Sequence, residues 1–140
     1  MINTVNTDKY LNELKEEFSF YSDKRELLEA MVEKGKELPK MPEELLIKEN
    51  KVPGCVSGVY IKISKENNGK YYFIGHSESM IVRGYVKVLF DLLEGKTKEE
   101  ILASEEKINS FVDETGLAES MLTSRASAFG NIIRFIKEKL

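Results

Sequence analysis

Several residue types are scarce in this chain of 140 residues, which has one cysteine, one histidine and no tryptophan. One cysteine cannot form an internal disulfide. It also excludes a Cys-x-x-Cys redox pair and a zinc or iron–sulfur site built from several thiolates, so we expect no metal and no cofactor of the protein's own. Because no disulfide framework needs an oxidising compartment, we expect the protein in the reducing cytoplasm.

Charge of one sign and long apolar runs are also missing. The formal net charge is −3 and no basic run occurs, which argues against a nucleic-acid-binding module. The longest nearly apolar stretch, 80–93, contains Arg83, Lys87 and Asp91, so it cannot span a bilayer. The first 15 residues lack the basic and apolar regions of a secretory signal. We therefore expect neither a nucleic acid nor a membrane as a partner.

Apolar residues with helical spacing predict most of the chain to be helical. We expect one domain over 1–140, with 1–6 as a loose end. Capping patterns at Thr7, at Asp23–Glu26 and at Thr97–Glu100 mark helix starts, and glycines mark ends near 35, 95 and 116. The predicted helices are 8 to about 18, about 24–35, a central buried helix at 80–93, two short helices between 98 and 115, and a C-terminal helix at about 124–138.

A hairpin at about 59–75 provides the predicted sheet. Val59, Ile61 and Ile63 alternate with polar residues, and Asn68-Gly69 suits a two-residue turn. That turn pairs Ile63 with Ile74 and Ile61 with His76, and a longer loop would shift this register. His76 then lies at the end of the hairpin where the chain enters from Cys55. Helices, a small antiparallel sheet and further helices predict an α+β fold.

The only cysteine, Cys55, lies in the turn Pro53-Gly54-Cys55-Val56-Ser57-Gly58 rather than in an apolar run. Loops lie at surfaces, and glycine permits close approach of another backbone. Free cysteines are nonetheless often small core residues, so this context leaves a reactive and a structural thiol both open. A plain interaction module with an inert buried thiol is therefore one alternative.

His76 is the only histidine, and it offers two interpretations. A free-standing Cys–His enzyme would use it as the general base for Cys55, whereas a histidine partly covered at a strand end needs no chemical role. Arg125 is predicted in the first turn of the last helix, where a cation opposes the helix dipole. A residue placed against local preference can mark a functional position, and the alternative is an exposed arginine that extends over a nearby aromatic side chain such as Phe129.

The chain contains, in this order, the segments "VPGCVSGVYI", "GHSESMIVRGYVKVLF" and "LTSRASAFGNIIRFIK". Together they resemble the SufE family of sulfur-acceptor proteins. The first is similar to the segment around that family's cysteine, the second to its Gly-x-Ser-Asp-Ala-x-Ile-Val-(Lys/Arg)-Gly segment, and the third to its Ser-Arg helix. The resemblance covers about 8–140. It implies the SufE/IscU-like α+β fold, and one cysteine fits the carrier rather than the cluster scaffold of that fold.

The resemblance implies a function and a set of site residues. Cys55 takes the position of the residue that accepts persulfide sulfur from a PLP-dependent cysteine desulfurase, SufS-like or CsdA-like, and the sulfur then goes to a SufBCD-type scaffold complex. The protein would be a desulfurase activator rather than an autonomous enzyme, and a monomer or weak homodimer. The loop and partner-binding positions that we expect from the motifs are Gly54, Val56, Ser57, His76, Glu78, Arg83 and Arg125. The chain departs from the family pattern at Glu78-Ser79, at His76 and at Thr123-Ser124, which lacks the motif proline.

Overall fold

The computed structural model describes residues 6–54, 58–117 and 128–140. In this part of the chain the elements are, in order, α1 (Thr7–Ser19), α2 (Lys24–Lys36), the 3-10 turns η1 (Glu43–Leu45) and η2 (Lys48–Asn50), β1 (Tyr60–Lys65), β2 (Lys70–His76), α3 (Met80–Leu93), β3 (Lys96–Thr97), α4 (Lys98–Thr115) and α5 (Ala128–Lys139). The predicted α+β class is confirmed. Among these helices, none is both long enough and apolar enough to cross a membrane.

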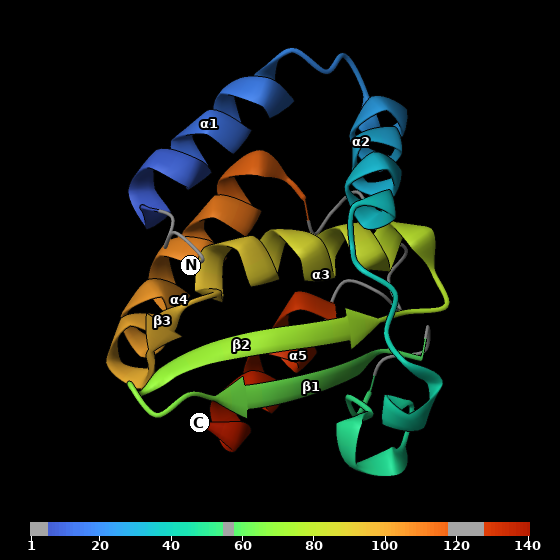
Figure 1. The fold of residues 1–140 in the computed structure, drawn as a ribbon. Coiled ribbons are helices and arrows are strands. Elements are labelled where there is room, and N and C mark those ends of the chain that lie inside the picture. Colours follow the sequence, from blue (N-terminus) through green and yellow to red (C-terminus); the bar gives the residue numbers. More distant parts are fainter. Residues whose placement is uncertain (1–5, 55–57, 118–127) are drawn as a thin grey trace.

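The sheet is antiparallel, has the order β1-β2-β3, and packs one face against helices (Figure 1). The buried helix α3 runs along β2, and α5 lies behind the strands. Phe73 of β2 stacks on Phe90 of α3 with the ring centroids 5.3 Å apart. Most of the described buried apolar residues form one cluster, to which α1, α2, α3, α4 and α5 contribute. The polar end of this sheet, where β2 leads into α3, is where the candidate site lies.

Helices α2 and α3 cross in close contact through two glycines. A Cβ atom on Gly84 would lie 2.1 Å from the carbonyl oxygen of Met31, and a Cβ on Gly35 would lie 2.4 Å from that of Met80. Real Cβ atoms do not approach this closely, so only glycine allows the two backbones to meet here. Helix α2 ends at Lys36, close to the predicted end near Gly35, and Gly35 itself lies in the crossing.

The predicted hairpin register is wrong by one residue. Ile61 pairs with Gly75, Ile63 with Phe73, and Tyr60 with His76. The loop has three residues, because Glu66 N donates to the Lys70 carbonyl and Gly69 takes the left-handed conformation with φ 81°. A slip of one residue moves every side chain of a strand to the other face. His76 therefore lies on the outer face of the sheet, opposite to the buried Ile61.

Three other expectations are corrected or refined. The two short helices predicted between 98 and 115 are one helix, α4, because the hydroxyl of the buried Ser104 donates to the Ile101 carbonyl inside the helix and does not cap a new one. Strand β3 was not predicted. Asn6, expected in a loose end, caps α1 in place of the predicted Thr7 by accepting a hydrogen bond from Lys9 N, and Thr7 is the first residue of the helix. The predicted start of the last helix at about 124 lies outside the described residues.

Glu94, at the C-terminal end of α3, covers part of the open edge of β2. Its carboxylate accepts the backbone N–H of Phe73 at 3.2 Å, at a position beyond the short strand β3. Burial raises the pKa of Glu94 to about 7, although the Phe73 hydrogen bond and Lys87 oppose the shift. Burial therefore disfavours the ionised form of Glu94 in the folded protein relative to the unfolded chain.

We expect the stability of the protein to fall as pH rises from about 4.5 to about 7, because in this range folded Glu94 keeps a proton that the unfolded chain has released. One pKa unit corresponds to about 1.4 kcal/mol, and partial exposure screens the effect, so the contribution is about 1–2 kcal/mol. Glu94→Gln keeps an acceptor for Phe73 N and should flatten this slope in urea unfolding measured across the range. Replacement of the exposed Glu99 by glutamine is the control. Equal slopes for wild type and Glu94→Gln would contradict the assignment.

Candidate functional site

The residues just before and just after the segment 53–58, which includes Cys55, pair with each other. Val52 N donates to the Val59 carbonyl at 2.8 Å, and Lys51 forms an isolated antiparallel bridge with Tyr60. Both valines are buried, at 1% and 0% exposure. This short ladder fixes the base of the loop at the start of β1.

Two glycines border the cysteine segment, and both have left-handed backbone conformations, with φ 82° at Gly54 and 63° at Gly58. A Cβ on Gly54 would lie 3.0 Å from Nδ2 of Asn131, on α5, and a Cβ on Gly58 would lie 3.3 Å from Cγ of Glu78. The described borders of the segment thus lie between α5 and the turn that follows β2. A side chain at either glycine would be strained by the backbone conformation alone.

The turn from β2 to α3 is built by two serines. Ser77 is fully buried, and its Oγ accepts a hydrogen bond from Ser79 N at 3.2 Å. Ser79 caps α3, since its Oγ accepts the N–H of Val82 at 3.3 Å. The buried Ser77 leaves Glu78 on the outside of the turn.

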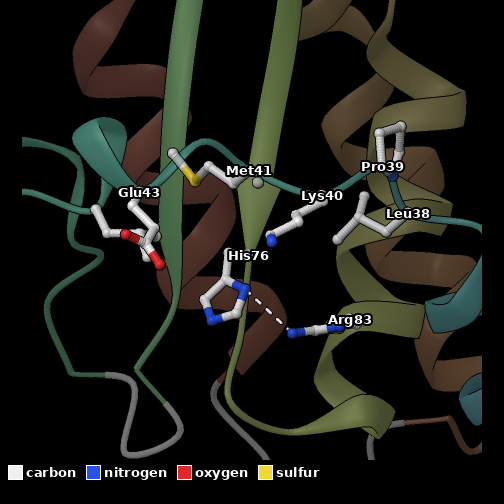
Figure 2. A pocket seen from close by; sticks show the side chains of 9 residues that line it. Leu38, Pro39, Lys40, Met41, Glu43, His76 and Arg83 are labelled. Carbon is white, nitrogen blue, oxygen red and sulfur yellow. Dashed lines mark hydrogen bonds between the residues drawn. The ribbon is translucent and has the colours of Figure 1, made fainter.

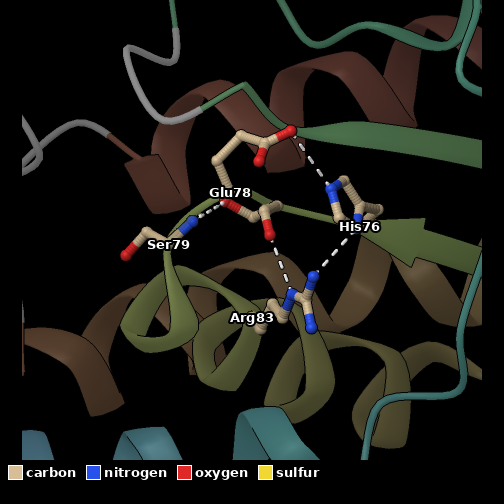
Figure 3. A network of polar contacts seen from close by, with 5 residues as sticks. His76, Glu78, Ser79 and Arg83 are labelled. Atoms are coloured by element: carbon tan, nitrogen blue, oxygen red, sulfur yellow. Dashed lines mark hydrogen bonds and ion pairs between the residues drawn. The ribbon is translucent and has the colours of Figure 1, made fainter.

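Arg83 ties this turn to the end of the sheet (Figure 3). Its Nε donates to the Ser77 carbonyl at 2.8 Å, and its Nη2 lies 3.2 Å from Nδ1 of His76. On the other side of the imidazole ring, Nε2 lies 3.3 Å from Oε1 of Glu78. Arginine only donates hydrogen bonds, so Nδ1 is the acceptor and Nε2 carries the proton that faces Glu78.

This tautomer bears on the alternative function, a free-standing Cys–His enzyme in which His76 would be the general base for Cys55. A general base needs a free ring nitrogen lone pair. In the observed arrangement the lone pair of Nδ1 accepts from Arg83, and Nε2 is protonated toward Glu78. His76 would have to give up the Arg83 contact before it could accept a proton from a thiol.

The structure brings together three of the predicted site residues, His76, Glu78 and Arg83, and places Gly54 beside α5. The other predicted site residues, Cys55, Val56, Ser57 and Arg125, lie outside the described residues. Sequence reasoning missed Asn131 on α5, because one asparagine in an amphipathic helix matches no motif. It also missed the hydrogen bond between Val52 and Val59, because Val52 lies in no strand pattern that would predict the pairing.

A pocket of about 420 Å³ opens beside His76 (Figure 2). The connection between α2 and η1 forms one wall, and the end of β2 with Arg83 forms the other. The lining residues are Leu38, Pro39, Lys40, Met41, Glu43, Leu46, Gly75, His76 and Arg83. Its wall is largely apolar, with two cations and one carboxylate. In the described parts of the chain, no three His, Cys, Asp or Glu residues are grouped so that they could hold a metal ion.

Comparison with known families adds to this geometry. The family model described as "SufE: Fe-S metabolism associated domain" matches residues 12–140. The match includes the cysteine loop, the turn with His76 and Glu78, and the last helix.

Curated proteins of the same kind are similar over long segments. An uncharacterized SufE-like protein of Synechocystis is 38% identical over 129 residues, which are 92% of this chain and 79% of that protein. The sulfur acceptor protein CsdE of Escherichia coli is 38% identical over 92 residues, 66% of this chain and 61% of the relative. The cysteine desulfuration protein SufE of Wigglesworthia glossinidia brevipalpis is 31% identical over 108 residues, 77% of this chain and 74% of the relative.

One solved structure has a similar fold. The solution structure of a hypothetical protein from Thermus thermophilus superposes with a TM-score of 0.70 and covers 93% of this chain and 92% of its own. At 20% sequence identity, this likeness concerns the fold alone.

Proposed function

The chain belongs to the SufE family, and we propose that it is a sulfur acceptor that takes persulfide sulfur on Cys55 from a PLP-dependent cysteine desulfurase. The desulfurase is SufS-like or CsdA-like, and the acceptor stimulates its turnover by removing the sulfur. The sulfur then goes to a SufBCD-type scaffold for iron–sulfur cluster assembly. The proposed setting is the cytoplasm, where thiols stay reduced, and the acceptor acts as a monomer or weak homodimer without a cofactor of its own.

The chemical step is a thiol–persulfide exchange. The Cys55 thiolate attacks the outer sulfur of the cysteine persulfide on the desulfurase, a new S–S bond forms on Cys55, and the old S–S bond breaks. The desulfurase cysteine leaves as a thiolate and is ready for the next substrate. No external oxidant or reductant is needed, because the sulfane sulfur moves between two thiols.

The observation that supports this proposal best is the geometry of the residues that border the segment with Cys55, the only cysteine in the chain. Its loop is closed at the base by the hydrogen bond between Val52 and Val59, and it is bordered by Gly54 and Gly58, which have no Cβ. A carrier must present its thiol to one partner after another. A segment that is held at its base and bordered by two residues without side chains suits entry into a partner's active site. The partner's backbone can approach such residues closely.

Mass spectrometry tests the proposal directly. The protein is incubated with a SufS-like desulfurase and L-cysteine, alkylated and digested. We expect the mass of one additional sulfur atom on the peptide that contains Cys55, and none when L-cysteine is left out. An active desulfurase that leaves this peptide unchanged would contradict the acceptor role. A CsdA-like desulfurase in a parallel reaction shows which enzyme is the better donor.

A further inference from the structure

Arg83 is a partly buried cation without a carboxylate partner among the described residues. Its two hydrogen bonds go to neutral acceptors, the Ser77 carbonyl and Nδ1 of His76, and the ion pairs of the described residues do not include it. Glu78, the nearest acid in this cluster, contacts the opposite side of the imidazole. A cation removed from water gains from an anion that comes within hydrogen-bonding distance.

The pocket beside His76 presents this cation together with a second one. Lys40 lies on the connection between α2 and η1, and Figure 2 shows its amine and the Arg83 guanidinium near the His76 ring. Glu43 is the only acid among the lining residues, so the lining carries one positive charge in excess. Leu38, Pro39 and Met41 give the pocket an apolar wall. A single carboxylate would balance the excess positive charge of the lining, and a short aliphatic stem would pack against its apolar residues.

We propose that this pocket receives an aspartate or glutamate side chain of the docked desulfurase, with Arg83 and Lys40 as its cationic contacts. The inference depends on the proposed sulfur-acceptor function. The inference also depends on the position of the pocket relative to the segment that contains Cys55. His76 lines the pocket and belongs to the cluster with Glu78, and Glu78 in turn lies against Gly58 at the border of the cysteine segment. A partner that reaches this border to exchange sulfur therefore docks beside residues that line the pocket.

The test uses Lys40→Glu, since Lys40 is exposed and its replacement should not disturb the core. Desulfurase turnover is measured against increasing concentration of the acceptor. We expect the concentration for half-maximal stimulation to rise about tenfold or more, with the maximal rate unchanged, because the charge contacts the docked partner and not the reacting sulfur. Lys98→Glu makes the same charge change at an exposed position at the start of α4, distant from the pocket, and should behave as wild type.

Equal half-saturation for Lys40→Glu and wild type, or an equal loss in Lys98→Glu, would overturn the pocket assignment. Acidic residues on the docking face of the desulfurase are then changed singly to lysine. One of these changes should restore half-saturation with Lys40→Glu and impair it with wild type, and failure of all of them would overturn a partner carboxylate. Sulfur labelling of wild-type Cys55 is followed in the same reactions. Its absence would refute the acceptor function itself, whereas its presence with an unaffected Lys40→Glu would refute the pocket alone.

Discussion

Replacement of Cys55 by serine abolishes the stimulation of desulfurase turnover while the protein remains folded. The hydroxyl of serine cannot form the S–S bond that receives the sulfane sulfur, and it does not ionise to a nucleophile near neutral pH. The chain has no second cysteine to substitute for the first, so we expect a complete loss and not a partial one. No disulfide is removed, and the thermal midpoint should stay close to that of wild type.

The measurement is alanine or sulfide production by the desulfurase with each acceptor variant at equal concentration. A matched control moves the thiol and keeps the number of cysteines. Ser64 is exposed on β1, and Ser64→Cys in the Cys55→Ser background supplies one accessible thiol at a different place. This double variant should not restore stimulation. Full stimulation by Cys55→Ser, or equal rescue by the displaced thiol, would contradict a specific acceptor cysteine.

Replacement of Gly84 by alanine strongly destabilises the fold. The new Cβ would lie 2.1 Å from the carbonyl oxygen and 2.7 Å from the carbonyl carbon of Met31. These atoms belong to the backbone of α2, so no side-chain rotation relieves the overlap and the two helices must separate. Overpacking of a close-packed interior typically costs 1–3 kcal/mol and sometimes more, and we expect a loss of about 3 kcal/mol and a thermal midpoint lower by roughly 10 °C.

Gly130→Ala is the matched control for this prediction. It makes the same chemical change inside a helix, α5, at an exposed position with nothing within 4 Å of the added Cβ. Alanine is the better helix former, so this variant should gain about 0.5–1 kcal/mol. Urea unfolding monitored by circular dichroism compares both with wild type. Equal stability of Gly84→Ala and wild type would show that α2 and α3 do not need the close crossing.

The crossing also explains why a glycine follows Arg83 in the α3 segment. A Cβ on Gly35 would lie 3.0 Å from Cβ of Arg83, so the backbone of α2 packs directly on Arg83. The guanidinium of this arginine contacts Ser77 and His76. The two glycines therefore serve the site as well as the core. They bring α2, and with it the connection that carries Lys40, next to the end of β2.

Local patterns predicted the elements that depend on neighbouring residues. The bounds of α3 agree with the predicted 80–93, because a wide apolar face and a serine cap determine them within one segment. The hairpin was predicted from Asn68-Gly69, yet its register was not. The same tripeptide Asn67-Asn68-Gly69 fits a loop of two or three residues, and only the pairing of Glu66 with Lys70 chooses between them.

The sequence by itself determined the α+β class, the caps at Asp23 and Thr97 and the SufE family motifs, because each depends on residues close together in the chain. Only the tertiary structure decided that His76 faces outward and accepts from Arg83, that Asn131 lies against Gly54, and that Lys40 shares a pocket with Arg83. These contacts join segments far apart in the sequence, and each follows from a strand register or a helix crossing. A shift of one residue in the hairpin, or one methyl group at Gly84, would rearrange them.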